Sequence, residues 1–186
     1  MTALIQSFGP LGVFLLMVPE SACIPVPSEV TLIFSGFAVS QHWMSLALAV
    51  LAATAGNLVG SLIAYALGAS GIVARVPGRR LVFGPAERLL DRRGVSAVFV
   101  ARLLPLARTF VSLPAGARRL PIVPFILLTT VGCALWAVLF VVLGMVSGSA
   151  WSAVSSVVGK VLLGAGLVIV ACVVLRRPRG ASHDGD

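Results

Sequence analysis

The sequence predicts an all-α polytopic membrane protein with a single domain, and three observations lead to this prediction. Of the 186 residues, 59% are hydrophobic and only 11% are charged, whereas soluble domains carry about 25% charged residues. The mean hydropathy is +1.07. Residues 30–74 and 120–159 contain no Asp, Glu, Lys or Arg, and about 20 apolar residues are enough for a helix to cross the hydrocarbon core. We therefore expect one membrane domain over residues 1–175, followed by a polar cytoplasmic tail over residues 176–186.

The placement of the arginines predicts orientation and argues against nucleic acid as a partner. The formal net charge is +8, with six arginines in residues 75–93 and three in residues 176–179. Basic residues that flank apolar spans stay in the cytoplasm, whereas a basic patch that binds nucleic acid lies on a soluble fold. We expect both segments, and therefore the C-terminus, on the cytoplasmic side of a bacterial inner membrane. Residues 87–93 can form an amphipathic surface helix that meets anionic lipid head groups, or they can serve as an orientation signal only.

The three cysteines are scattered through apolar sequence without a CxxC pair or a metal-ligand spacing. Reduced, small apolar residues are the simplest interpretation of such cysteines. We expect neither a metal nor a cofactor.

Four apolar stretches are expected as helical membrane segments, namely Phe8–Val18, Trp43–Leu67, Ile122–Val146 and Trp151–Leu175. The first is short for a span, and Pro19 is expected to end it. Because residues 75–93 and the start of the third segment should both be cytoplasmic, residues 94–117 must leave the cytoplasm and return to it. These 24 residues cannot cross twice, which needs about 40, and we expect a re-entrant hairpin there.

A second hairpin is expected over residues 20–40, entering from the opposite face. That stretch is poor as a plain span because it carries two acids and two prolines, Glu20, Pro25, Pro27 and Glu29. Irregular backbone at membrane depth is tolerated where protein or a watery cavity surrounds it.

An internal repeat supports the two hairpins. Pro25 and Pro105 each stand eleven residues before a glycine, Gly36 and Gly116 respectively, and the spans that follow also align, Gly56 with Gly132 and Gly68 with Gly144. Each repeat would be a re-entrant hairpin followed by a transmembrane helix, with a final C-terminal transmembrane helix. Inverted repeats with discontinuous helices are the construction of many secondary transporters. The prolines and glycines of the motifs are expected to set the hairpin geometry, namely Pro25, Pro27, Gly36, Pro105 and Gly116.

Four charges fall inside the expected hairpins, two acids in the first and two arginines in the second: Glu20, Glu29, Arg102 and Arg108. One charge at the centre of a lipid-embedded helix costs about 2.5–3.5 kcal/mol, so four unpaired charges would cost on the order of 10 kcal/mol. We expect the four to converge at mid-bilayer depth, facing one another or a cavity. Salt bridges that merely pin the hairpins are the alternative, although apolar residues would pin them at least as well.

These residue types predict a transport site for a phosphate group. Arg102 and Arg108 are expected to bind the phosphate, because guanidinium stays charged and matches phosphate oxygens bidentately. Glu20 and Glu29 are expected to carry protons or to displace phosphate from arginine, because burial and a neighbouring arginine act on a carboxyl in opposite directions. Three hydroxyls either add hydrogen bonds to the ligand or bond back to helix carbonyls, namely those of Ser28, Thr109 and Ser112.

From about Val18 to about Gly148 the chain resembles the DedA family of bacterial membrane proteins, also called the VTT or SNARE-associated domain family. The first matching motif is Glu20-Ser-Ala-Cys-Ile-Pro25-Val-Pro27-Ser-Glu29, followed by Gly36. The second is Phe99-Val-Ala-Arg102-Leu-Leu-Pro105-Leu-Ala-Arg108-Thr-Phe-Val-Ser-Leu-Pro-Ala115-Gly116, and the match continues through Phe125, Gly132 and Trp136 to Gly144.

The resemblance implies two opposed re-entrant hairpins and the translocation of a polyprenyl phosphate carrier or a phospholipid, driven by the proton motive force. The family's two essential acids and two essential arginines map to Glu20, Glu29, Arg102 and Arg108. Members usually have a methionine soon after the Ala-Gly pair, where this chain has Arg118-Arg119-Leu120-Pro121. Pro-Gly-Glu is often found where this chain has Pro27-Ser28-Glu29. These departures bear on the identity of the lipid more than on the class of protein.

The leading hypothesis is a proton-coupled flippase, not an enzyme, that returns undecaprenyl or decaprenyl phosphate to the cytoplasmic leaflet. A phospholipid flippase or scramblase is the nearest alternative. A polyprenyl diphosphate phosphatase is a further one, because the residues from Glu20 to Ser28 faintly resemble the first motif of those enzymes, although their Ser-Arg-Ser-Gly run is absent. The last alternative is a scaffold that supports other membrane proteins. Membrane lipids and protons are the expected partners, and the sequence leaves a homodimer open.

Overall fold

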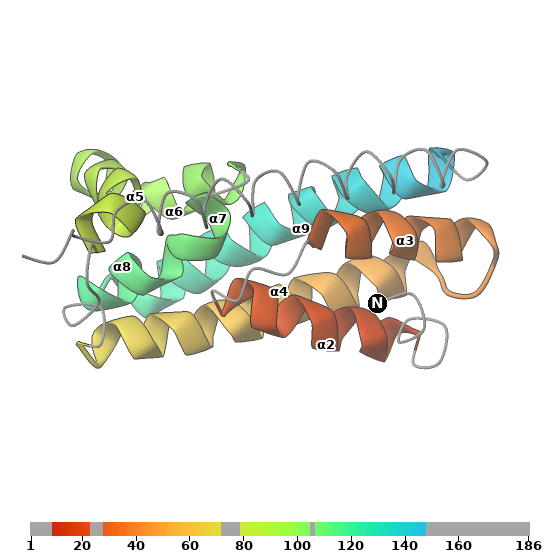
Figure 1. The fold of residues 1–186 in the computed structure, drawn as a ribbon, viewed down its shortest axis with the longest axis horizontal. Helices are drawn as coiled ribbons and strands as arrows, with labels where there is room; N and C mark the ends of the chain where they lie inside the picture. The colour runs from red at the N-terminus through yellow and green to blue at the C-terminus, as the bar shows by residue number, and fades with distance from the viewer. Residues whose placement is uncertain (1–8, 23–27, 72–78, 105–106, 148–186) are drawn as a thin grey trace, which may run out of the picture. The chain divides into compact units, whose positions relative to one another are not determined.

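The computed structural model describes residues 9–22, 28–71, 79–104 and 107–147, and the regular elements within these ranges are all α-helices (Figure 1). The predicted all-α class is therefore confirmed. The expected C-terminal segment Trp151–Leu175 and the tail after it lie outside the described residues.

Two long helices provide the frame on which the site is built. Helix α4 is Leu46–Ala69 and helix α9 is Ile122–Val146, close to the two long spans expected from the uncharged runs. Both are long and apolar enough to cross a bilayer. Large apolar side chains cover their outward faces, and lipid tails can solvate such a surface. The exposed ones include Leu48, Leu51, Val59, Ile63, Leu67, Val123, Leu127, Val131, Leu135 and Leu139.

Two shorter apolar helices pack on this frame. Helix α2 is Pro10–Ser21 and packs mainly on α4, whereas α3, Ser28–Ser40, packs mainly on α9 (Figure 1). The expectation that Pro19 ends the first helix is wrong, since α2 runs through it to Ser21. A proline inside a helix removes one hydrogen bond and crowds the carbonyl four residues earlier, and here the helix continues for only two residues beyond it. Residues 23–27, with Pro25 and Pro27 among them, lie outside the described residues.

Four short helices follow α4. They are α5 (Arg79–Arg93), α6 (Ser96–Arg102), α7 (Ala107–Phe110) and α8 (Ser112–Ala117). Helix α6 packs on α9, and α8 packs on α4. Residues 96–117 are thus divided among three short helices, and the re-entrant hairpin expected for residues 94–117 stays a prediction. Pro105, between α6 and α7, is outside the described residues.

Glycines allow two pairs of helices to touch through their backbones. On the α3–α9 crossing, a Cβ atom on Gly36 or Gly144 would lie 2.0 or 2.1 Å from a carbonyl oxygen of the facing helix. On the α4–α8 crossing, a Cβ atom on Gly68 or Gly116 would lie 2.1 or 2.0 Å from such an oxygen. These contacts are too close for any side chain, so the four glycines set the helix separations on both sides of the site.

The basic helix α5 covers the ends of the short helices. Its apolar side buries Phe83, Ala86 and Leu90, and the centroid of the Phe83 ring lies 6.2 Å from that of Phe110 of α7. Its arginines at positions 88, 92 and 93 are exposed. Residues 87–93 are therefore part of a longer helix with one apolar and one basic side, and its contact with lipid head groups stays a prediction.

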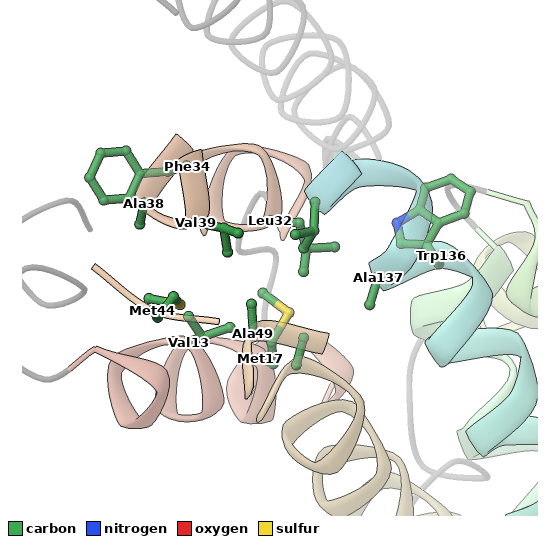
Figure 2. Packing of buried hydrophobic residues seen from close by; sticks show 12 residues of the cluster. Val13, Met17, Leu32, Phe34, Ala38, Val39, Met44, Ala49, Trp136 and Ala137 are labelled. Atoms are coloured by element: carbon green, nitrogen blue, oxygen red, sulfur yellow. The ribbon is translucent and has the colours of Figure 1, made fainter. Parts of the chain in front are cut away.

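A continuous apolar cluster lies among α2, α3, α4 and α9 and borders the site. Figure 2 shows most of its members, including Met17 of α2, Leu32 of α3, and Trp136 and Ala137 of α9. A second cluster surrounds Phe125, which is fully buried, near the start of α9. The polar residues described next are enclosed by these apolar side chains.

Candidate functional site

A buried ion pair joins the two halves of the chain. Arg108 of α7 places Nη2 2.5 Å from Oε1 of Glu20, which stands one residue before the end of α2. The two residues are 5% and 4% exposed, respectively. The same Nη2 donates a hydrogen bond to the hydroxyl of Ser28 at the start of α3. The guanidinium carbon of Arg108 also lies 4.8 Å from the centroid of the Trp136 ring, a cation–π contact.

Arg102 holds the backbone around the pair in place. This residue ends α6 and is 2% exposed. Its Nη1 donates to the backbone carbonyl of Arg108 at 2.8 Å, and its Nη2 donates to the hydroxyls of Ser61 and Ser112, both at 2.7 Å. Arg102 therefore ties α6 to α4, α7 and α8 at once. Gly132 of α9 makes this possible, because a Cβ atom there would lie 2.6 Å from the Cβ of Arg102.

Further hydrogen bonds connect α2 to α4 beside the ion pair. The hydroxyl of Ser21 donates to Oδ1 of Asn57 at 2.5 Å, and the hydroxyl of Ser61 donates to the backbone carbonyl of Asn57 at 2.6 Å. Since Ser61 also accepts from Arg102, the network reaches from the end of α2 to the end of α6. Every member is buried, which makes each of these hydrogen bonds costly to lose.

These side chains surround a small cavity with room for about one water molecule. The residues that line it come from α2, α4, α6, α7 and α9: Glu20, Ser21, Asn57, Arg102, Arg108, Cys133 and Trp136. Guanidinium groups in general match phosphate oxygens well, and in this site the carboxylate of Glu20 is paired with Arg108. In the described ranges, no group of three or more His, Cys, Asp or Glu side chains could hold a metal ion.

The structure brings together three of the four charges expected at the site, Glu20, Arg102 and Arg108. Of the expected hydroxyls, Ser28 accepts from Arg108 and Ser112 accepts from Arg102. Two expected residues do not line the cavity, Glu29 and Thr109. Glu29 is half-buried in the first turn of α3, and Thr109 is half-buried on α7.

Five residues of the site were not predicted as site residues from the sequence. They are Ser21, Asn57, Ser61, Cys133 and Trp136. One of them carried a usable signal. Asn57 is a carboxamide in the middle of a long uncharged span, and polar groups in such spans usually face a protein interior or a watery cavity.

The chain matches a family model and several bacterial proteins. The family model of the VTT domain matches residues 26–146. An alkaline phosphatase-like protein of Lactococcus lactis subsp. lactis is 29% identical, over 97% of this chain and 94% of the relative. Undecaprenyl phosphate transporter A of Bacillus subtilis is 30% identical, over 81% and 78%. An uncharacterized membrane protein of Mycobacterium tuberculosis is 37% identical, over 73% and 69%. No solved structure matches this chain.

Proposed function

The chain belongs to the VTT-domain family, also called the DedA family, and we propose that it carries a polyprenyl phosphate across the bacterial cytoplasmic membrane in exchange for protons. The lipid would be undecaprenyl phosphate or a close analogue, returned to the cytoplasmic leaflet for reuse as a carrier. A relative from Bacillus subtilis named undecaprenyl phosphate transporter A supports this substrate, as does one of the same name from Staphylococcus aureus, 26% identical over 77% of this chain.

The observation that carries the proposal is the buried Glu20–Arg108 ion pair beside a cavity with room for about one water molecule. In this arrangement the carboxylate of Glu20 occupies Arg108 in the way that a phosphate oxygen would. A phosphate group enters only when Glu20 yields its place on the arginine.

Proton coupling follows from this competition. Protonation of Glu20 removes its negative charge, so that Arg108 is free to bind the phosphate. Loss of that proton on the other side of the membrane restores the carboxylate, which displaces the phosphate again. Glu29 is the second proposed proton carrier, because it neighbours Ser28, whose hydroxyl accepts from Arg108. Arg102 orients Arg108 through the carbonyl hydrogen bond and adds positive potential to the cavity.

Inverted repeats would provide the alternating access that such a carrier needs. In the sequence repeat, Gly36 corresponds to Gly116 and Gly68 corresponds to Gly144. The same repeat relates the two helix crossings to each other. Gly36 and Gly144 lie on the α3–α9 crossing, and their counterparts Gly116 and Gly68 lie on the α8–α4 crossing. This supports a design in which two re-entrant hairpins enter from opposite faces and meet at the site, as in many secondary transporters.

The proposal is tested with purified full-length protein in liposomes that carry polyprenyl phosphate and an imposed proton gradient. We expect the wild-type protein to change the leaflet of the lipid faster than protein-free vesicles do, and faster with the gradient than without it. Arg108→Ala should abolish this. Arg118→Ala is the matched control, because Arg118 is an exposed arginine at the end of α8, and it should keep wild-type transport. Transport at the protein-free rate by the wild-type protein would refute the proposal.

The alternatives are separated in the same vesicles. A phospholipid flippase or scramblase would move a labelled phospholipid in place of polyprenyl phosphate. The alkaline phosphatase-like name of the Lactococcus lactis relative makes phosphate release from polyprenyl diphosphate worth measuring in parallel. We expect no release, and release that is lost in Glu20→Gln would replace the transport proposal with an enzymatic one.

A further inference from the structure

One carboxamide side chain lines the cavity beside the ion pair and the two arginines. Asn57 stands in the middle of α4, is 1% exposed and lines the cavity. A carboxamide at this depth loses its hydration on folding and needs hydrogen-bond partners in return. Asn57 lies within a helix long enough to cross the membrane, so the hydrogen-bond partners of its amide must be sought at the site.

The oxygen of this amide is satisfied, whereas its nitrogen is not strongly engaged. Oδ1 accepts from Ser21 at 2.5 Å. Among the described residues, the partner of Nδ2 is the thioether sulfur of Met17 at 3.8 Å. An amide nitrogen has two hydrogens to donate, and a thioether is a weak acceptor. At least one N–H of Asn57 is thus available to a stronger acceptor in the cavity.

The orientation of the amide is held by the network around it. Ser21 has a single hydroxyl hydrogen, and its contact with Oδ1 of Asn57 is much shorter than its 3.5 Å contact with the carboxylate of Glu20. Because Ser21 keeps the oxygen, the nitrogen is left for another partner. The backbone carbonyl of the same residue accepts from Ser61, so both the side chain and the main chain of Asn57 are fixed.

We propose that Asn57 is a third ligand of the transported phosphate and the residue that selects a phosphomonoester over a phosphodiester, an inference that rests on the proposed function. A guanidinium fork engages two oxygens of a phosphate at once. A monoester has a third non-bridging oxygen, which accepts from the amide of Asn57. A diester has an ester oxygen with a substituent in that place, so the buried donor stays unsatisfied and the substituent crowds it.

This inference names the lipid class by its head group. Polyprenyl monophosphates are monoesters, whereas the common membrane phospholipids are diesters and greatly outnumber them in the bilayer. A carrier for a scarce lipid needs such discrimination, and two arginines alone do not provide it, since both head groups carry oxygens that a guanidinium binds. A neutral donor adds the distinction without adding charge to the site.

The test measures binding of farnesyl phosphate and of its methyl diester to the purified full-length protein in detergent micelles. We expect the wild-type protein to bind the monoester at least about tenfold more tightly, the worth of one hydrogen bond to a charged group. Asn57→Leu should bring the two dissociation constants to within about threefold, chiefly by weakening the monoester. Asn57→Asp is the second variant, because it keeps an acceptor for Ser21 and replaces the donor with a carboxylate oxygen. Its negative charge also repels the phosphate, and the monoester more than the diester, so it should lose the preference as well.

Thr54→Val is the matched control, since Thr54 lies one turn away on α4, is 9% exposed and does not line the cavity. It should keep the wild-type preference. If both Asn57 variants keep the wild-type ratio of dissociation constants, or weaken both lipids equally, Asn57 has a structural role only and this inference is overturned while the proposed function stands. A wild-type protein that binds neither lipid overturns both.

Discussion

Removal of the Glu20 charge alone should lower the free energy of unfolding by about 3 kcal/mol. Glu20 and Arg108 are 4% and 5% exposed, and 2.5 Å separates the paired atoms. Breaking a buried ion pair at one partner costs about 3–5 kcal/mol, because the other charge is left buried without compensation. In Glu20→Gln, Arg108 keeps the Ser28 hydroxyl and the face of Trp136, which places the expected loss at the lower end of that range.

The double variant Glu20→Gln with Arg108→Gln distinguishes stability from transport. It removes both charges, and its two amides can hydrogen-bond to each other, so it should recover most of the stability lost in Glu20→Gln. Transport should nevertheless be lost in both single variants and in the double variant, because neither proton binding nor phosphate binding is restored. Unfolding by denaturant in detergent micelles measures the first quantity, and leaflet exchange of polyprenyl phosphate in liposomes measures the second.

Two results would refute this reasoning. A loss below about 1 kcal/mol in Glu20→Gln would mean that water screens the pair as it screens surface pairs. Wild-type transport by the double variant would mean that the pair merely pins α2 to α7 and that the phosphate binds elsewhere.

Three more predictions concern the packing, the surface and the state of the cavity. Gly36→Ala should destabilise the protein by about 1–3 kcal/mol or more, because the new Cβ would lie 2.0 Å from a carbonyl oxygen of α9. The control is Gly84→Ala, whose Cβ would have nothing within 4 Å, and it should change the unfolding free energy by less than about 1 kcal/mol. Asp91→Ala breaks the salt bridge between Asp91 and Arg118, whose side chains are 64% and 32% exposed, respectively. It should also lower the unfolding free energy by less than about 1 kcal/mol, and by less still in high salt. Cys133 is 5% exposed and lines the cavity. In a background whose other two cysteines are serine, it should resist a water-soluble maleimide in the folded protein and react once the protein is unfolded, as mass spectrometry of the labelled protein would show.

The long helices could be predicted closely from the sequence, because a membrane span is specified locally. An uncharged apolar run of sufficient length forms a helix whatever else surrounds it. The expected segment Trp43–Leu67 corresponds to the helix Leu46–Ala69, and the expected segment Ile122–Val146 is a helix with the same bounds. The meeting of Glu20 with Arg108 could also be anticipated, since the cost of an isolated charge in lipid requires a partner and the two signs fell in different segments.

The remainder of the site depends on contacts that local patterns do not encode. Ser21 and Asn57 are 36 residues apart in the chain, and Ser61 and Arg102 are 41 apart. Serine in an apolar helix more often bonds back to its own backbone, as Ser35 does with the carbonyl of Thr31. Nothing in the spacing distinguishes such a serine from one that accepts from an arginine. Only the approach of the helices, set by glycine contacts, decides between the two.

The partners of Arg108 suit a site that must stay folded when empty and still exchange its ligand. An arginine without any carboxylate would leave a buried charge uncompensated between transport cycles. An arginine held by two carboxylates would be fully neutralised, and a phosphate would have to displace both. Arg108 has one carboxylate, one hydroxyl and one aromatic face. In the proposed mechanism, protonation of Glu20 alone opens Arg108 to phosphate. The Ser28 hydroxyl and the Trp136 ring would then hold the guanidinium in position while its ligand changes.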